Sequence, residues 1–257
     1  MKIDYDSLAE VFDGTRSQSK ELLEAVTLGI STIVSGGERI LDIGCGTGRF
    51  LLPISRTGAI SFGIDISPKM LQKARGKGLE NLARADAAAL PFADGSFKAS
   101  LVTNVLHLVP EWKGLMSEAC RVSSRAVLSF KIDRGDGDPI AAFKSIMDRM
   151  GIAQPRAGPL ESELMEQCKP EFVIELGGYM ERMAMHDILS AFEMRTYTFQ
   201  SELTDEQNRA CMEEYASMFK GEEVSYANNV AMIVWHPMRL RKEIERATFD
   251  YPQARTF

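Results

Sequence analysis

Arg39-Ile-Leu-Asp-Ile-Gly-Cys-Gly-Thr-Gly48 is a short apolar strand that runs directly into a glycine-rich turn. Glycine tolerates backbone conformations that other residues avoid, so this turn can bend sharply and hold a ligand against bare peptide groups. A dinucleotide-binding loop has the spacing GxGxxG, whereas the third glycine here comes one residue earlier. The stretch predicts a strand, a ligand-binding turn and a helix, and its spacing disfavours a nicotinamide cofactor.

Short apolar runs alternate with helical patterns on both sides of this turn. Strands are expected at 39–43, 60–64, 82–85, 99–103 and 126–131, which is typical of a parallel sheet covered on both faces. Further strands are expected at 172–176 and 229–235, and residues 179–220 are expected to be mostly helical. The predicted fold class is α/β, with a doubly wound, mostly parallel seven-stranded sheet and an inserted helical cap before the last strand.

The composition, the net charge and the Cys and His spacing exclude several classes of protein. The 257 residues are 45% hydrophobic and 26% charged, which is ordinary for a globular chain. The net charge of -6 repels phosphate backbones, so no nucleic-acid partner is expected. No apolar run approaches the about 20 residues that span a bilayer, and the acidic start lacks a signal peptide, so a cytoplasmic protein is expected. The four cysteines form no CxxC pair and the three histidines are isolated, so no metal site is expected.

Polar residues follow three further predicted strands. In open parallel sheets, ligands bind beyond the carboxyl ends of the strands. Asp65 lies about twenty residues beyond the turn, where an acidic residue holds both hydroxyls of a ribose. Asp86, followed by Ala87, suits the edge of an adenine, and Asn104 lies at the mouth of the central strand. The glycine turn and these residues together predict a nucleoside site.

Three motifs carry a resemblance to a known family. Beside the glycine turn they are Gly63-Ile-Asp-Ile-Ser-Pro-Lys-Met70 and Ala85-Asp-Ala-Ala-Ala-Leu-Pro-Phe-Ala-Asp-Gly-Ser-Phe97. The set resembles class I S-adenosylmethionine-dependent methyltransferases, and within them the small-molecule branch typified by ubiquinone and menaquinone biosynthesis. The resemblance covers about half of the chain, from Arg39 to roughly Lys131. It implies a Rossmann-like fold and S-adenosyl-L-methionine as the cofactor, with S-adenosyl-L-homocysteine as the product.

The same resemblance implies roles for individual residues. Asp42 would anchor the methionine amino group or the loop, Asp65 would bind the ribose, and Ile66 would lie against the adenine. Tyr5 and Arg16 belong to an N-terminal segment that in such proteins often closes over the cofactor, although both residues are equally typical of a surface helix. The implied cofactor site comprises Tyr5, Arg16, Asp42, Gly44, Cys45, Gly46, Gly48, Asp65, Ile66, Asp86, Ala87, Asn104 and Val105.

Two departures from the family's pattern concern a turn and a catalytic pair. The segment 121–125 replaces a Pro-Gly turn, and His107-Leu108 replaces a frequent His-His pair. His107 is the candidate general base, because it follows the mouth of the fourth strand and an imidazole titrates near neutral pH. A packed histidine on a helical turn is the competing interpretation. His186, in the expected cap, is a second candidate base, and Tyr179 and Tyr197 are candidates for lining the substrate pocket.

The resemblance divides the single domain 1–257 into four parts: N-terminal helices (1–36), a cofactor-binding core (37–133), sheet completion with a helical substrate cap (134–228), and the last strand with the C-terminal tail (229–257). Nine of the fourteen methionines lie between Met147 and Met218. Methionine adapts to irregular apolar surfaces, which favours a small apolar or aromatic acceptor, although ordinary helix core explains the same pattern.

The expected reaction is in-line methyl transfer, with proximity and orientation as the main catalytic effect. A tRNA or rRNA methyltransferase and a non-catalytic nucleoside-binding scaffold remain alternatives. The oligomeric state stays open.

Overall fold

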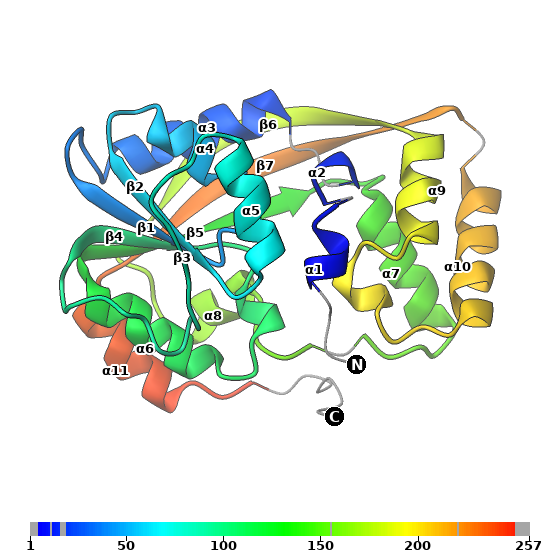
Figure 1. Ribbon diagram of the computed structural model, residues 1–257. Helices are drawn as coiled ribbons and strands as arrows, with labels where there is room; N and C mark the ends of the chain where they lie inside the picture. The colour runs from blue at the N-terminus through cyan, green and yellow to red at the C-terminus, as the bar shows by residue number, and fades with distance from the viewer. Residues whose placement is uncertain (1–4, 11, 16–18, 155, 220, 250–257) are drawn as a thin grey trace.

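The computed structural model describes residues 5–249 except residues 11, 16–18, 155 and 220. Seven strands lie in this part of the chain: β1 (Arg39–Ile43), β2 (Ile60–Asp65), β3 (Leu82–Arg84), β4 (Phe97–Val102), β5 (Ser123–Arg134), β6 (Phe172–Ala184) and β7 (Glu223–Trp235). They form one open sheet in the order β3-β2-β1-β4-β5-β7-β6 (Figure 1). Strand β7 is antiparallel to β5 and to β6, and the remaining pairs are parallel. The predicted α/β class with a mostly parallel seven-stranded sheet is confirmed.

Helices connect these strands and cover the sheet. Along the described chain they are α1 (Tyr5–Leu8), α2 (Phe12–Thr15), α3 (Lys20–Ser31), α4 (Leu51–Ser55), α5 (Pro68–Gly76), η1 (Leu106–Leu108), α6 (Trp112–Val122), α7 (Pro139–Arg149), α8 (Glu161–Gln167), α9 (Met185–Glu193), η2 (Thr198–Gln200), α10 (Asp205–Met218) and α11 (Pro237–Arg246). Pro53 lies within α4, which is one reason that this helix is short. Segment 121–125 continues directly from α6 into β5.

The central strands are largely apolar because helices bury both faces of the sheet. In β1, Ile40 packs into the cluster formed with α3 and α4. Leu41 and Ile43 point to the other face and pack into the cluster formed with α6, α8 and α11. The same alternation recurs in β5, where Leu128 and Val127 belong to opposite clusters. This packing holds the carboxyl ends of β1, β2 and β4 in fixed positions relative to one another.

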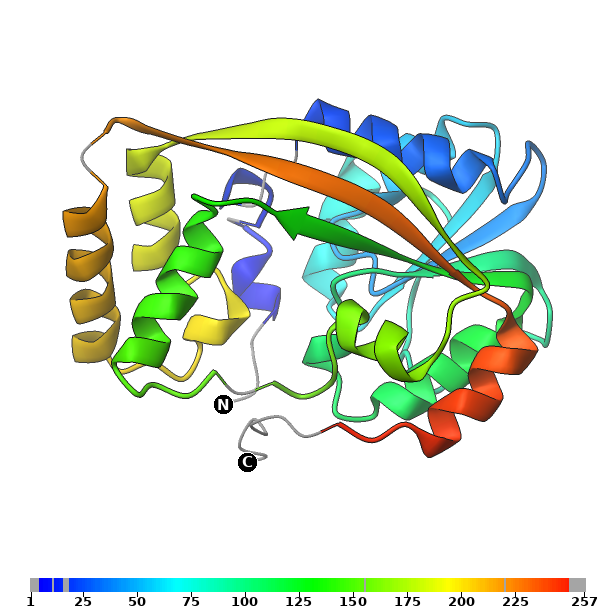
Figure 2. The same ribbon diagram turned by 180° about the vertical axis from the view of Figure 1, so that it is seen from behind.

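A second lobe with its own apolar core lies at the outer ends of β6 and β7. Figure 2 shows both strands running from the central sheet to the helices α7, α9 and α10. The core of this lobe contains the buried rings of Phe143, Phe192 and Tyr215. Phe143 and Phe192 lie 4.2 Å apart between ring centroids, and Phe192 meets Tyr215 edge-on at 5.2 Å. We call this lobe, comprising α7, α9, η2, α10 and the outer parts of β6 and β7, the cap.

The prediction that residues 179–220 are mostly helical is wrong for Tyr179–Ala184. Strand β6 continues to Ala184, and β7 begins at Glu223, six residues before the expected start. The pairing register of β6 shifts at a bulge between Glu175 and Gly177, and Gly177 has φ +97°. Beyond this bulge β6 continues through the glycines, at which a strand would normally end. Cross-strand pairing with β7 therefore overrides the local sequence preference of this segment.

Other features of the described chain concern membranes, cysteines and metals. No helix in this part of the chain has the length and apolarity needed to cross a bilayer. All four cysteines are buried and free, as expected of small apolar side chains. Among the described residues, no group of three or more His, Cys, Asp or Glu side chains is arranged to hold a metal ion.

Candidate functional site

The glycine turn after β1 is held against the end of β2 by its own backbone. The N–H groups of Gly44 and Cys45 both donate to the carbonyl of Ile64, at 2.9 Å. Gly48 has φ +76°, and a Cβ there would lie 2.3 Å from Leu79 Cδ1, so this position needs glycine for packing. Gly46 has φ +55°, and a Cβ there would meet nothing within 4 Å. Gly46 therefore presents its backbone to open space.

Asp65, at the end of β2, ties this turn to the start of α5. Its Oδ2 accepts a hydrogen bond from Gly46 N at 2.8 Å, and its Oδ1 accepts one from Ser67 N, also at 2.8 Å. Burial raises the pKa of Asp65, although these backbone donors oppose that shift. Ser67 also accepts a hydrogen bond from Met70 N and caps α5. The carboxylate thus links two structural motifs that are separated in sequence.

Asp42 lies beneath the turn as a second buried acid. Its side chain is 4% exposed and borders the same cavity as Asp65. Burial, with a further contribution from the negative charge of Asp65, raises the pKa of Asp42 to about 7. A cationic group bound nearby would favour the ionised form of this carboxyl and lower that pKa.

The ends of β2 and β3 provide one apolar and one polar surface. Ile66 is 53% exposed in the cavity wall, although large aliphatic side chains are usually buried. Asp86 is exposed, and its Oδ1 accepts a hydrogen bond from Ala88 N at 2.9 Å. Ala87, which follows Asp86 in the sequence, also borders the cavity. A flat ring could therefore contact Ile66 while its polar edge reaches Asp86.

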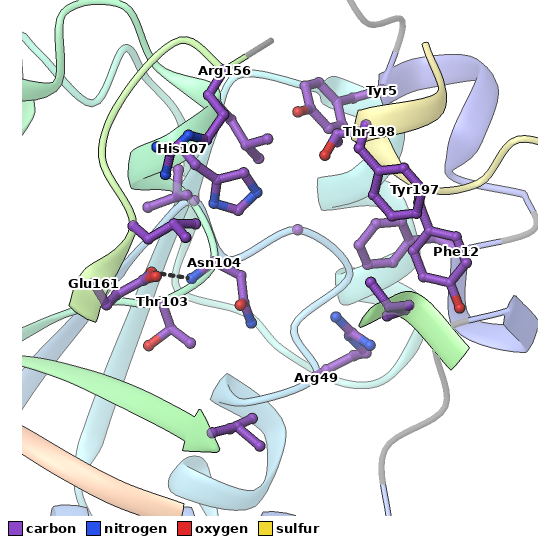
Figure 3. Close-up of a pocket in the computed structure, with 18 of the residues that line it drawn as sticks. Tyr5, Phe12, Arg49, Thr103, Asn104, His107, Arg156, Glu161, Tyr197 and Thr198 are labelled. Carbon is purple, nitrogen blue, oxygen red and sulfur yellow. Dashed lines mark hydrogen bonds between the residues drawn. The ribbon is translucent and has the colours of Figure 1, made fainter. Parts of the chain in front are cut away.

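The end of β4 carries a strained residue held by a distant helix. Asn104 has φ +57°, which is uncommon for a residue other than glycine. Its backbone N–H donates to Glu161 Oε1 at 3.0 Å, as Figure 3 shows, and Glu161 is the first residue of α8. Burial raises the pKa of Glu161. Thr103 Oγ1 is buried and has no hydrogen-bond partner among the described residues, so a polar ligand atom could satisfy it.

Two short N-terminal helices lie against the turn. In α2, Asp13 accepts a hydrogen bond from Thr47 Oγ1 and pairs with Lys77, both at 2.6 Å. In α1, Asp6 accepts a hydrogen bond from the side chain of Ser67. Tyr5, beside it, borders the cavity. These contacts hold the N-terminal segment over the glycine turn.

One cavity of about 1920 Å³ joins these groups to the cap. Its volume exceeds the roughly 300–1,000 Å³ of a single small-molecule pocket, so it has room for a cofactor and an acceptor together. Figure 3 shows Tyr5, Phe12 and Tyr197 on one side of this cavity and His107 on the other. Arg156 lies near His107 and forms a two-bond ion pair with Glu163, at 2.8 Å for each bond.

The structure brings most of the predicted site residues to this one cavity. Those that border it are Tyr5, Asp42, Gly44, Cys45, Gly46, Asp65, Ile66, Asp86, Ala87, Asn104, Val105 and His107. Gly48 is not among the lining residues, because it packs against α5 and the segment after it. Arg16 lies outside the described residues.

The remaining candidate residues also divide into those that border the cavity and those that do not. Tyr179 and Tyr197 border the cavity, whereas His186 is exposed beside Asp187 and does not. Of the nine methionines in 147–218, the cavity lining includes Met183 and Met194. The cap side of the cavity is instead rich in aromatic rings, which include Tyr179, Tyr197, Phe199 and Tyr226.

Several lining residues were missed by sequence reasoning. Glu161 and Arg156 come from the segment between α7 and β6, which folds back onto η1. Ala157 N donates to His107 O at 3.0 Å, and a Cβ at Gly158 would lie 2.2 Å from Leu106 O. The glycine of Gly158-Pro159 marks this close approach, but nothing in the sequence indicates which segment it approaches.

Comparison with known proteins agrees with this geometry. The profile of a family described as "Methyltransferase domain" matches residues 41–126. A demethylmenaquinone methyltransferase from Tropheryma whipplei (strain Twist) is 45% identical over 92 residues, which is 35% of this chain and 38% of that protein. A malonyl-[acyl-carrier protein] O-methyltransferase from Erwinia pyrifoliae is 31% identical over 164 residues, covering 60% of this chain and 58% of that protein. The chain thus matches about two fifths of the first relative and just over half of the second.

Among solved structures, the YcgJ protein from Bacillus subtilis superposes with a TM-score of 0.51 at 18% identity, covering 82% of this chain and 98% of that one. This likeness concerns the fold. The matched domain includes the glycine turn, Asp65, Asp86 and Asn104, which the structure places around one cavity. Over residues 41–126 the chain is therefore similar to known methyltransferase domains, and the fold and the cavity agree with that likeness.

Proposed function

We propose that this protein transfers a methyl group from S-adenosyl-L-methionine to a small acceptor bound between the sheet and the cap. The observation that carries the proposal is the convergence of the exposed backbone of Gly46, the carboxylate of Asp65 and the exposed side chain of Ile66 on one cavity. The volume of that cavity, which also reaches the cap, supports the binding of a second molecule beside the cofactor.

The residues present fit this cofactor. The proposed ribose ligand is Asp65, and Ile66 with Ala87 and Asp86 would receive the adenine. Asp42 would face the positively charged methionyl part, and its raised pKa of about 7 is the property of a buried acid that a cation would stabilise. Thr103 Oγ1, buried and without a partner among the described residues, supports a polar ligand atom close to Asn104. We further propose that Tyr5, with α1 and α2, covers this part of the cavity.

The bound cofactor supplies an electrophilic methyl group on a sulfonium. The protein's tasks are then to align the acceptor behind that group and to exclude water. Correct placement of two reactants contributes roughly 7–11 kcal/mol in well-oriented cases. The N-terminal helices and the cap both line the cavity and would provide that alignment. His107 borders the cavity and is proposed to accept a proton from an acceptor that must lose one.

The acceptor is proposed to be a small, apolar or aromatic molecule. Support comes from the rings of Tyr179, Tyr197 and Phe199 on the cap side of the cavity. Tyr197 and Phe199 are stacked with their ring centroids 5.5 Å apart and their planes 10° apart. Half-buried rings that border a cavity offer a large apolar contact area to a flat molecule.

Two measurements test the proposal. Calorimetry with S-adenosylmethionine, S-adenosylhomocysteine and NAD should give binding of the first two and none of NAD. Incubation with methyl-labelled cofactor and fractionated small metabolites should then transfer label to a low-molecular-weight product. A labelled RNA fraction, with affinity that falls steeply as salt rises, would instead indicate an RNA methyltransferase. Tight cofactor binding with no label transferred to any fraction would indicate a nucleoside-binding scaffold.

A further inference from the structure

A lysine from the cap borders the cavity and has no ion-pair partner among the described residues. Lys144, on α7, is half-buried and lines the cavity. Its Nζ lies over the ring of Phe199, 5.2 Å from the ring centroid. Such a cation–π contact is weaker than a desolvated ion pair, so it satisfies the ammonium only in part.

The acidic side chains near Lys144 are engaged elsewhere. Asp138 caps the N-terminus of α7 by accepting hydrogen bonds from Ile140 N at 3.3 Å and Ala141 N at 3.1 Å. Asp148 accepts a hydrogen bond from Gln154 Nε2 at 2.6 Å. Within the part of the chain that the structure describes, Lys144 forms no ion pair with either acid. The negative charges of both acids raise the pKa of Lys144 from a distance, but the ammonium pairs directly with neither of them.

Two neighbouring arginines make a bound anion beside Lys144 more favourable. Burial lowers the pKa of Lys144, and the positive charges of Arg134 and Arg156 lower it further. Both arginines also border the cavity. Arg156 is neutralised by Glu163, whereas Arg134 is 4.0 Å from Asp138, which already caps α7. A negatively charged ligand group beside Lys144 would reduce this repulsion and raise the pKa of the lysine.

An aromatic surface adjoins the lysine. The stacked rings of Tyr197 and Phe199 border the same cavity, and Phe199 contacts Lys144 directly. A flat ligand lying along these rings would place a substituent within reach of Nζ. The neighbouring side chains thus combine an apolar surface for a ring with a positive charge at its edge.

We infer that the acceptor site takes an aromatic acid, whose ring lies along Tyr197 and Phe199 and whose anionic group pairs with Lys144. This inference rests on the proposed function, because it treats the cap side of the cavity as the acceptor site. It specifies the charge of the acceptor, which the methyl-transfer proposal leaves open.

A matched pair of fluorescent probes tests the inference. Anilinonaphthalene sulfonate carries an aromatic body and one negative charge, and phenylnaphthylamine has the same body without that charge. Lys144→Met should weaken binding of the sulfonate by about tenfold or more, because a charge pair in a partly desolvated site is lost. Binding of phenylnaphthylamine should change by less than about twofold. Lys144→Arg keeps the positive charge and should retain most of the sulfonate affinity.

The control is Lys20→Met, because Lys20 is an exposed lysine whose pair with Glu24 lies on the surface of α3. Its sulfonate affinity should equal that of the unmodified protein. The inference is overturned if the unmodified protein does not bind the sulfonate, if Lys144→Met leaves its affinity unchanged, or if both probes are weakened equally. Calorimetry with S-adenosylhomocysteine on every variant shows that the core is folded. Failure of that ligand to bind the unmodified protein would refute the proposed function, whereas failure of the probe test alone refutes the aromatic acid.

Discussion

Gly46 N donates a hydrogen bond to Asp65 Oδ2 at 2.8 Å, which joins the glycine turn after β1 to the end of β2. The other carboxylate oxygen accepts a hydrogen bond from Ser67 N. A carboxylate offers about four acceptor positions, so Asp65 keeps acceptor capacity for a hydroxyl group of a ligand. Asp65 therefore shapes the turn and also keeps acceptor capacity for the proposed ribose.

Replacing Asp65 by alanine should weaken S-adenosylhomocysteine binding by about a hundredfold, because hydrogen bonds to a charged group contribute about 1.5–3 kcal/mol each. Calorimetry at neutral pH measures this change. Asp94→Ala is the matched control, because the Asp94 side chain is 81% exposed and lies outside the cavity lining. An Asp65→Ala protein that is folded and binds with unchanged affinity would refute the ribose assignment.

Asp42 should make the stability of the protein depend on pH. Its pKa is raised from 3.8 to about 7 by burial and by the charge of Asp65, so the folded state binds a proton that the unfolded state has already lost. The free energy of unfolding should therefore fall as pH rises from about 4 to about 7, and then level off. Asp42→Asn should be more stable than the unmodified protein by roughly 2–4 kcal/mol at pH 8, with the difference vanishing near pH 4.

Urea unfolding of both proteins across this pH range measures the effect. Asp65, the second buried acid, contributes to the pH dependence of the unfolding free energy in both proteins. If the pKa of Asp65 is the same in both, this contribution cancels in the difference between them. A stability difference that stays constant between pH 4 and pH 8 would contradict the raised pKa of Asp42.

Two glycines in the turn should respond differently to alanine. Gly48→Ala places a Cβ 2.3 Å from Leu79 Cδ1 at φ +76°, and should destabilise the fold by roughly 2–4 kcal/mol through crowding and backbone strain. Gly46→Ala meets no atom within 4 Å and should cost only the strain of its backbone conformation, about 1–2 kcal/mol. Its methyl group would instead enter the proposed cofactor site.

Thermal unfolding and calorimetry separate the two effects. The Gly48→Ala protein should show the larger fall in Tm, and the Gly46→Ala protein should show the larger loss of S-adenosylhomocysteine affinity per degree of Tm lost. The reverse order would place the cofactor away from Gly46.

His107 should contribute to the rate of methyl transfer once an acceptor is found. His107→Gln should lower kcat by at least about a hundredfold, the lower range for loss of a general base, with little change in KM for the cofactor. His186→Gln is a control of the same residue type, because His186 is exposed and lies outside the cavity lining. An unchanged kcat would assign His107 to packing rather than to proton transfer.

Local sequence patterns predicted the core well because their physical causes are local. Ile40, Leu41 and Ile43 are apolar because both faces of β1 are buried, and Ser67-Pro68 predicts the start of α5 through its cap. The same patterns did not predict the outer half of β6. Tyr179–Ala184 is a strand because it pairs with Glu223–Asn228, a partner 39 to 49 residues away along the chain.

The sequence by itself therefore determined the core strands, the glycine turn and the acidic residues at the strand ends, since each depends on neighbours within a few residues. The tertiary structure decided which distant side chains share the cavity. Glu161 reaches Asn104 because the segment before α8 folds back onto η1, and Lys144 meets Phe199 because α7 and η2 pack in the cap. Contacts of this kind depend on long-range packing of apolar surfaces, which leaves no local periodicity in the sequence to identify them.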